Sequence, residues 1–318
     1  MVVAIWNSLA VPDVLTDLRS ACAVVAEKAH YVRIDPDQTS AYVGTLPVDL
    51  EPAEPDPEYH LTNGNREDLA AFWLTLDAIN FGSGWFPTLR KREGRSGYFT
   101  IAAGVRNRFE ALGPWCPDEL AGIDAVAIAE TLGQDPGHEL MALFARSLND
   151  LGRRVATDHE GRFAAVIDAA ESSAVALVDE LRTWECFADS SRYDGLDVPF
   201  LKRAQIAAAD LARAGVAAFR DLGRLTMFAD NLVPHVLRMD GLLSYDQALL
   251  HRIDRGELIE HGSAEEVEIR ACALHAVGLL AAERAGAREA DIDSVLWRRG
   301  QEPRYKDSPR HRSRCTAY

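Results

Sequence analysis

The sequence predicts a mostly α-helical protein with a small β contribution at most. Capping residues followed by apolar side chains at helical spacing recur along the 318 residues. The two-residue alternation that is typical of strands is rare. With 47% hydrophobic residues, the chain is large enough to bury a sizeable core as one large domain or as two lobes.

The first part of the chain contains one predicted helix, one short strand and a loop. Residues 13–29 carry a helical pattern of apolar side chains, and YVRI at 31–34 alternates as a short strand does. Residues 45–60 are rich in proline and acidic residues, which is typical of a surface loop. We therefore divide the chain into residues 1–64, packed on the main body, and a helical domain of residues 65–318.

The central part contains three predicted helices and a second strand. Asn65 precedes residues 66–79, in which apolar side chains recur at helical spacing. YFTIAAGV at 98–105 is the other strand candidate. Residues 135–155 begin with Asp-Pro, which places proline in the first turn of a helix, and the Ala-rich, amphipathic run 159–184 follows.

Capping motifs predict two further helices near the C-terminus. The S-x-x-Q motif at 244–247 opens a helix that Gly256 ends. The S-x-x-E capping box at 263–266 opens a longer helix that Gly286 ends. A binding site in such a protein would lie between packed helices.

The charge of the chain argues against long nucleic acid as a partner. The net charge is −15, and residues 298–314 hold seven basic and two acidic residues, which gives +5 there and leaves −20 elsewhere. Polymeric DNA or RNA attracts broad basic surfaces, which this chain offers only locally. A small anionic ligand fits the charge better.

The cysteines and the known motifs exclude several other classes. The five cysteines are dispersed and form no C-x-x-C, which favours reduced thiols in the cytoplasm over a disulfide framework or zinc site. No apolar run approaches the roughly 20 residues that span a bilayer. The sequence also lacks H-E-x-x-H, G-x-S-x-G and both glycine-rich phosphate motifs. We expect no metal, no cofactor and no membrane partner.

Residues 189–234 contain the most informative side chains. Lys202 and Arg203 fall near the start of a predicted helix, where the macrodipole disfavours cations. Asp230 is a lone carboxylate among apolar residues, where loss of hydration raises a pKa. These placements suit an anchor for an anionic ligand and a carboxylate tuned for chemistry. The alternatives are a helix N-cap for Asp230 and a solvated face for the two cations.

A second candidate segment is DAINFGSGWF at 77–86. Asn80 lies beside Phe81 and Trp85 where a helix gives way to a glycine-containing loop. An amide next to aromatic rings suits a flat heterocyclic base, which needs stacking surface and paired hydrogen-bonding groups. The alternative is a capping asparagine above core aromatics.

Several separated segments together resemble the queuosine salvage proteins, the queuosine 5′-phosphate N-glycosylases. They occur in the family's order, and the most specific are the KRAQ and FAD-x-x-VP pieces. The segments are LDAINF (76–81), HELMALFARSLNDLG (138–152), FADSSRYDGLDVPFLKRAQIAAADL (187–211), LTMFADNLVP (225–234), EEVEIRACALHAV (265–277), DSVLW (293–297) and HRSRCTAY (311–318).

The resemblance implies a helical fold distantly similar to the helix-hairpin-helix DNA glycosylases. It also implies hydrolysis of the N-glycosidic bond of a 7-deazaguanine nucleoside 5′-monophosphate, which releases queuine and ribose 5-phosphate. By position, Asp230 matches the catalytic carboxylate and Lys202 the active-site lysine, while Asn80 and Phe81 fall on the base-binding segment.

Other positions match less completely. Asp189 and Tyr193 fit the D-x-S-x-Y pattern of the family, and His30 alone matches in the first 60 residues. His235 follows Val-Pro where the family pattern has glutamine. The loop after Phe81 is glycine-rich where another aromatic residue is expected, so Trp85 is the candidate substitute.

The chemistry assigns provisional roles to these residues. A carboxylate opposite the base stabilises positive charge on the ribose and deprotonates the attacking water, which we expect of Asp230. A 7-deaza base cannot be protonated at N7, so Asn80 and an acid such as Asp189 or Asp194 would assist its departure. The remaining question is the 5′-phosphate, for which the candidates are Lys202, Arg203 or the basic C-terminal segment with His311 and Arg312.

Two other functions remain open at this point. A DNA-repair glycosylase would share the helical architecture, but the acidic charge and the lack of an evident helix-hairpin-helix sequence weigh against it. A non-catalytic protein that binds a queuosine nucleotide would not need a desolvated carboxylate near the ribose. The expected partner is therefore a small nucleotide, and the oligomeric state stays unknown.

Overall fold

A computed structural model describes residues 13–318. The prediction of a mostly α-helical protein is confirmed, whereas similarity to helix-hairpin-helix glycosylases stays a prediction, as does the division at residue 64. The α-helices of the described residues are α1 (Val14–Lys28), α2 (Pro36–Val43), α3 (Arg66–Ala78), α4 (Gly97–Leu112), α5 (Pro117–Gly122), α6 (Ala125–Leu132), α7 (Glu139–Asp158), α8 (Phe163–Ala169), α9 (Ala174–Leu181), α10 (Lys202–Arg213), α11 (Val233–Met239), α12 (Gln247–Asp254), α13 (Ala264–Glu283), α14 (Glu289–Arg299) and α15 (Pro303–Lys306).

Two small antiparallel ladders make up the β structure of the described residues. β1 (Val32–Ile34) pairs with β4 (Leu243–Tyr245), and β2 (Ser191–Tyr193) pairs with β3 (Leu196–Val198). The strand predicted at 31–34 is thus confirmed as β1. The first ladder joins segments about 200 residues apart, which ties the N-terminal part of the chain to its C-terminal third.

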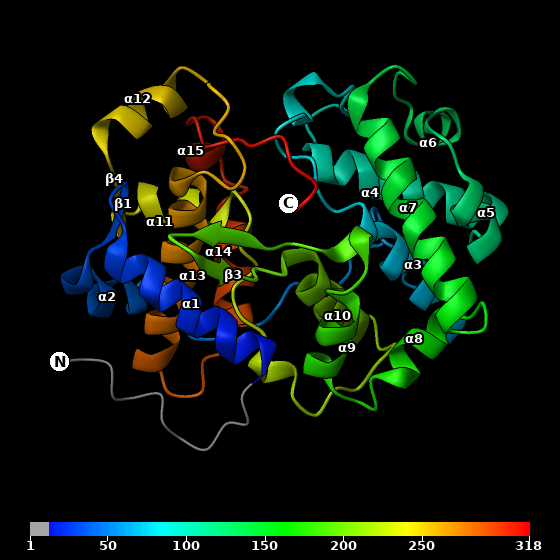
Figure 1. Cartoon of the computed structure of the whole chain (residues 1–318), viewed down its shortest axis with the longest axis horizontal. Coiled ribbons are helices and arrows are strands. Elements are labelled where there is room, and N and C mark those ends of the chain that lie inside the picture. The colour runs from blue at the N-terminus through cyan, green and yellow to red at the C-terminus, as the bar shows by residue number, and fades with distance from the viewer. Residues whose placement is uncertain (1–12) are drawn as a thin grey trace.

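The helices form two groups that meet in the middle of the molecule (Figure 1). One group contains α1, α2 and α11–α15, with α13 packed against α1, α2 and α14. The other contains α3–α8, with α7 packed against α5 and α6. α10 packs on α3 and α9 near the junction, and the C-terminal segment runs from α15 toward the centre.

Local capping explains where several helices begin. The side chains of Asp13, Asn65 and Ser263 accept hydrogen bonds from amides in the first turns of α1, α3 and α13. Each cap satisfies an amide that has no partner within the helix. The three helices predicted at these positions are therefore confirmed, although α13 ends at Glu283, three residues before Gly286.

The strand predicted at 98–105 is wrong, because these residues lie in α4. Ser96 caps this helix through the amide of Phe99, at 3.4 Å. Ile101, Val105 and Phe109 recur every four residues and are buried. The same apolar run therefore fits a helical period once it is read beyond residue 105.

Other predicted boundaries also need correction. The run 159–184 forms two helices, because Glu171 and Ser172 adopt positive φ values of 47° and 61° between them. α7 is capped by His138, so the Asp-Pro pair at 135–136 precedes the helix. Ser244 lies in β4, and Asp246 caps α12 in its place. Local rules thus located these helices but misplaced their first residues.

The loop predicted at 45–60 is confirmed and has a structural role. It contains no helix or strand, and residues 53–56 line the cavity described below. Among the described residues, none of the helices is both long and apolar enough to cross a membrane.

Candidate active site

A cavity of about 360 Å³ lies where the two groups of helices meet. Its wall combines α3 and the segment after it, one face of α10 along its whole length, the segment before α11, and α14. This volume falls within the range of sites that bind small molecules. Much of its surface is aromatic, contributed by Trp73, Phe81, Phe86, Tyr98, Phe99, Phe228, Trp297 and Tyr318.

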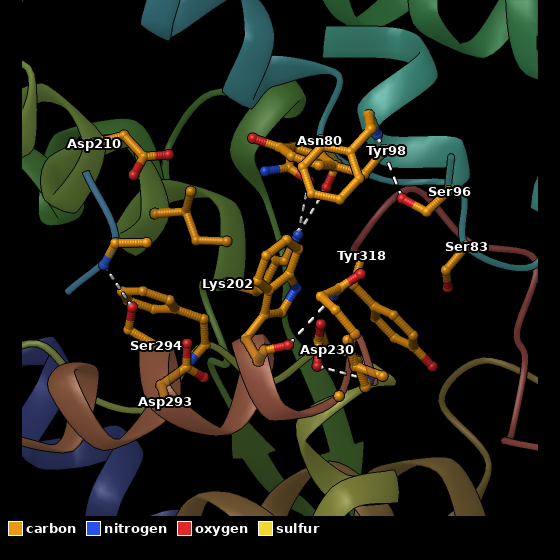
Figure 2. Close-up of a pocket in the computed structure, with 18 of the residues that line it drawn as sticks. Asn80, Ser83, Ser96, Tyr98, Lys202, Asp210, Asp230, Asp293, Ser294 and Tyr318 are labelled. Carbon is orange, nitrogen blue, oxygen red and sulfur yellow. Dashed lines mark hydrogen bonds between the residues drawn. The ribbon is translucent and has the colours of Figure 1, made fainter. Parts of the chain in front are cut away.

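Lys202 occupies the middle of this cavity (Figure 2). Its Nζ donates hydrogen bonds to the main-chain oxygen of Asn80 at 2.8 Å and to the side-chain Oδ1 of Asn80 at 3.2 Å. Burial lowers the pKa of Lys202 from 10.5 to about 8, although the nearby carboxylate of Asp230 acts in the opposite direction. Since Lys202 and Arg203 are 6% and 1% exposed, a solvated face is excluded.

Asp230 binds the start of a helix and is also a wall residue of the cavity. Its Oδ1 accepts hydrogen bonds from the amides of Leu232 at 2.8 Å and Val233 at 3.0 Å, at the start of α11. Burial raises its pKa, while the ammonium of Lys202 and the two amides oppose that rise. The N-cap position itself is Leu232, so Asp230 is not the N-cap that the alternative supposed, although it binds two amides at the start of this helix while lining the cavity.

Asp230 is not the lone carboxyl group that the sequence indicated. Asp293, on α14, also lines the cavity, and its Oδ1 accepts a hydrogen bond from the amide of Phe228 at 3.1 Å. Burial raises the pKa of Asp293 well above its usual range, and the charge of Asp230 raises it further. Lys202 and two amides oppose the rise in the pKa of Asp230, so burial favours the protonated form more strongly at Asp293 than at Asp230.

A buried ion pair connects the two segments that carry Lys202 and Asp230. Arg270, on α13, donates from Nη2 to Asp189 at 2.6 Å and from Nε to the carbonyl oxygen of Ala229 at 2.9 Å. The same oxygen of Asp189 accepts from the amide of Lys202 at 3.0 Å. Asp189 thus provides the anion that the start of α10 lacks in its own first turn.

Comparison with known proteins shows the family to which the chain is similar. The model of the family described as "Queuosine salvage protein" matches residues 59–318. The chain belongs to this family. A protein of Sphaerobacter thermophilus named "Queuosine 5'-phosphate N-glycosylase/hydrolase" is 37% identical over 308 residues, which cover 92% of this chain and 95% of the relative.

More distant relatives carry the same name. The protein of Dictyostelium discoideum is 30% identical over 260 residues, covering 78% of each chain. The protein of Mus musculus is 32% identical over 191 residues, covering 54% of this chain and 56% of its own. The similarity thus extends from a bacterium to eukaryotes.

The structure brings four of the twelve predicted site residues of this chain to the cavity wall. These are Asn80, Phe81, Lys202 and Asp230. They come from three parts of the sequence and meet at the junction of the two helix groups. Figure 2 shows Asn80 above Lys202 and Asp230 below it.

Three other predicted residues support the wall from behind. Arg203 donates to the carbonyl oxygen of Ala78 at 2.6 Å and lies over the ring of Phe81, 4.9 Å from its centroid. Trp85 is buried and donates to Glu139 at 2.8 Å. Asp189 is buried with Arg270 and is not part of the cavity wall. The structure gives these residues positioning contacts with the chain.

The two predicted histidines near the C-terminal segment are buried and uncharged. His235 hydrogen-bonds the carbonyl oxygen of Tyr305 at 2.9 Å, and burial lowers its pKa to about 4. Burial lowers the pKa of His311 to about 3. Neither residue lines the cavity, and a neutral imidazole is a poor partner for a phosphate.

The remaining three predicted residues lie at a separate surface hollow. His30, Tyr193 and Asp194 line this hollow together with Lys28. Asp194 forms an exposed ion pair with Lys28 at 2.8 Å, and Tyr193 donates to Glu268 at 2.8 Å. The structure does not bring these residues to the cavity.

Several wall residues were not predicted as site residues. Asp293 and Tyr318 fall within segments that resemble the family, so the sequence contained a usable signal for both. Tyr98 was assigned to a strand, and Asp210 lies on the second turn beyond Lys202 along α10. Arg310 directly precedes a matching segment.

The low pKa of Lys202 can be tested directly, because the chain has only four lysines. We expect the Lys202 amine to titrate near pH 8, since burial disfavours its charged form. An NMR titration of isotope-labelled lysine side chains measures this, and the signal is assigned by its loss in Lys202→Arg. A midpoint near the usual value of about 10.4 would contradict the burial of this ammonium.

Proposed function

We propose that this chain hydrolyses the N-glycosidic bond of queuosine 5′-monophosphate and releases queuine and ribose 5-phosphate. One observation carries the proposal. A carboxylate held by two amides lies beside a buried lysine in an aromatic cavity, in a chain that belongs to the queuosine salvage family. The names of the relatives, which specify queuosine 5′-phosphate, support the same substrate.

Asp230 acts on the ribose in this proposal. As the bond between C1′ and the base breaks, positive charge develops on C1′ and O4′, and the nearby carboxylate stabilises it. Water then attacks C1′, and Asp230 accepts the proton that the water loses. The two amide hydrogen bonds fix the carboxylate, so little reorganisation is needed when the charge appears.

Asn80 and Phe81 are placed to hold the base. Lys202 bonds both oxygens of Asn80, which fixes the direction of the side-chain amide. Arg203 supports the ring of Phe81 from behind. A flat base would then stack on an aromatic wall and meet an oriented amide, as its recognition requires.

Asp293 is the acid best placed to assist the departing base. The sequence indicated Asp189 or Asp194, but one is buried behind Lys202 and the other is exposed in a separate hollow. Asp293 lines the cavity, and burial raises its pKa well above the usual range, which favours the protonated form. A protonated carboxyl group can donate a hydrogen bond to the base as its negative charge grows.

The two alternative functions are less well supported by the cavity. A non-catalytic nucleotide binder has no need of two buried carboxyl groups with raised pKa values in its cavity. A repair glycosylase must bind a polymer, whereas most of the acidic charge lies outside the basic segment. The dispersed thiols also favour a reaction in the cytoplasm.

Asp230→Asn should abolish most base release, because it removes the charge that stabilises the ribosyl cation. The expected loss is on the order of 10² to 10³ in rate, as for other electrostatic stabilisers. The measurement is mass spectrometry of free queuine after incubation with queuosine 5′-monophosphate. Asp197→Asn, which changes an exposed carboxylate paired with Arg192, is the matched control. Turnover close to wild type in folded Asp230→Asn would refute the assignment.

The 5′-monophosphate should be a better substrate than the free nucleoside. The cavity wall carries four cationic side chains, and a phosphate contact would add binding energy that the nucleoside lacks. The comparison is kcat/KM for the two compounds under the same conditions. Equal values would show that these cations serve a different purpose.

Intact nucleic acid should not be a substrate. A polymer backbone would meet net repulsion from the −20 of charge outside residues 298–314. We expect no queuine from intact tRNA and no base from damaged duplex DNA, even at low salt where attraction is strongest. Release from either polymer at the rate of the mononucleotide would favour the repair-glycosylase alternative.

A further inference from the structure

The basic residues of segment 298–314 divide into two groups in the structure. Five of them are bound to other parts of the chain and are not available to a ligand. These are Arg298 with the carbonyl oxygen of Glu51, Arg299 and Arg304 with Asp240, Arg312 with the carbonyl oxygen of Gly256, and Arg314 with Glu139.

The other two, Lys306 and Arg310, line the cavity. Neither side chain has a hydrogen bond or ion pair with any residue between 13 and 318. Arg310 is partly buried, and burial lowers its pKa while the charge of Asp230 raises it. A partly desolvated guanidinium with no bonded partner is unfavourable, and an anionic ligand would remove that penalty.

The remaining cations of the wall are already engaged. Lys202 bonds Asn80, and Arg213 forms an ion pair with Asp210 at 3.0 Å. Arg203, another candidate from the sequence, is buried behind Phe81. Within the described part of the chain, Lys306 and Arg310 are therefore the cavity cations that stay unpaired.

We propose that Arg310, assisted by Lys306, binds the 5′-phosphate of the nucleotide. This inference rests on the proposed function and specifies one subsite of the same cavity. Arg310 lies within electrostatic reach of Asp230, so the phosphate would lie on the ribose side of the cavity, near the carboxylate that acts on C1′. The planar guanidinium suits two parallel hydrogen bonds to phosphate oxygens.

The position of Arg310 has a consequence for catalysis as well as binding. A phosphate dianion repels the carboxylate of Asp230, and this repulsion would raise the free energy of the bound substrate. A guanidinium that interacts with both groups offsets that repulsion. Lys306 is exposed, and its charge is therefore screened more strongly by solvent.

The test is the selectivity of Arg310→Ala for the phosphorylated substrate. We expect the ratio of kcat/KM for queuosine 5′-monophosphate over queuosine to fall on the order of 10- to 100-fold, the factor typical of a lost hydrogen bond to a charged group. Arg310→Lys retains the positive charge but cannot form two parallel hydrogen bonds, so it should keep part of the preference for the phosphorylated substrate. Lys306→Ala should lower it less.

The matched control is Arg304→Ala, which removes an exposed arginine of the same segment that is paired with Asp240. This variant should keep the wild-type ratio. A wild-type ratio in Arg310→Ala would overturn the proposal, and so would a loss that appears in Arg312→Ala instead.

A binding measurement separates this inference from the proposed function. Calorimetric titration with ribose 5-phosphate should show binding to the wild type and weaker binding to Arg310→Ala, with ribose as the uncharged comparison. If the wild type releases no queuine but binds ribose 5-phosphate more tightly than Arg310→Ala does, the proposed function is refuted and the proposed phosphate subsite is supported. Equal affinity of both proteins for ribose 5-phosphate would overturn the subsite alone.

Discussion

The site depends on the ion pair between Arg270 and Asp189, which have no exposed side-chain surface. Removing one partner of such a buried pair typically costs about 3–5 kcal/mol, because the other charge is left without compensation. Here each member of the pair also makes one hydrogen bond with the main chain. Asp189 accepts the amide of Lys202, and Arg270 donates to the carbonyl oxygen of Ala229. Two segments that carry the reactive groups are thus fixed relative to each other by one guanidinium.

The same guanidinium lies between two aromatic rings, which shield it from water. Its carbon is 3.9 Å from the centroid of Phe200 and 4.6 Å from that of Tyr318. Tyr318 is in turn a wall residue of the cavity, and its carbonyl oxygen accepts the amide of Gly82 in the loop after Phe81. The C-terminal segment therefore joins the positioning ion pair to the base-binding side of the cavity. This arrangement explains how residues so far apart in sequence form one wall.

The sequence predicted what depends on local structure and missed what depends on distant contacts. Caps such as Asn65 act within a few residues, so the start of α3 followed from the sequence. Asp230 and Lys202 were identified because each is unusual in its immediate surroundings. Asp293 had a signal in the matching segment DSVLW, but its chemistry depends on the packing of α14 beside Asp230, which no local pattern indicates. The other eight predicted residues do not line the cavity. They contact other parts of the chain or lie at a separate surface hollow, and these positions depend on the fold rather than on local sequence.

Charge illustrates the same distinction between composition and structure. In a chain of net charge −15, the sequence of a basic segment indicates a surface patch that binds an external anion. In the structure most of its arginines bind carboxylates and carbonyl oxygens of this chain, as Arg299 does with Asp240. These ion pairs and hydrogen bonds hold the segment against the rest of the molecule, so the arginines that form them are not available to bind a polymer. Because the segment is held in this way, the positions of Lys306 and Arg310 are fixed at the cavity. The local excess of basic residues is thus largely structural, and the part left for a ligand is small enough to suit a single phosphate.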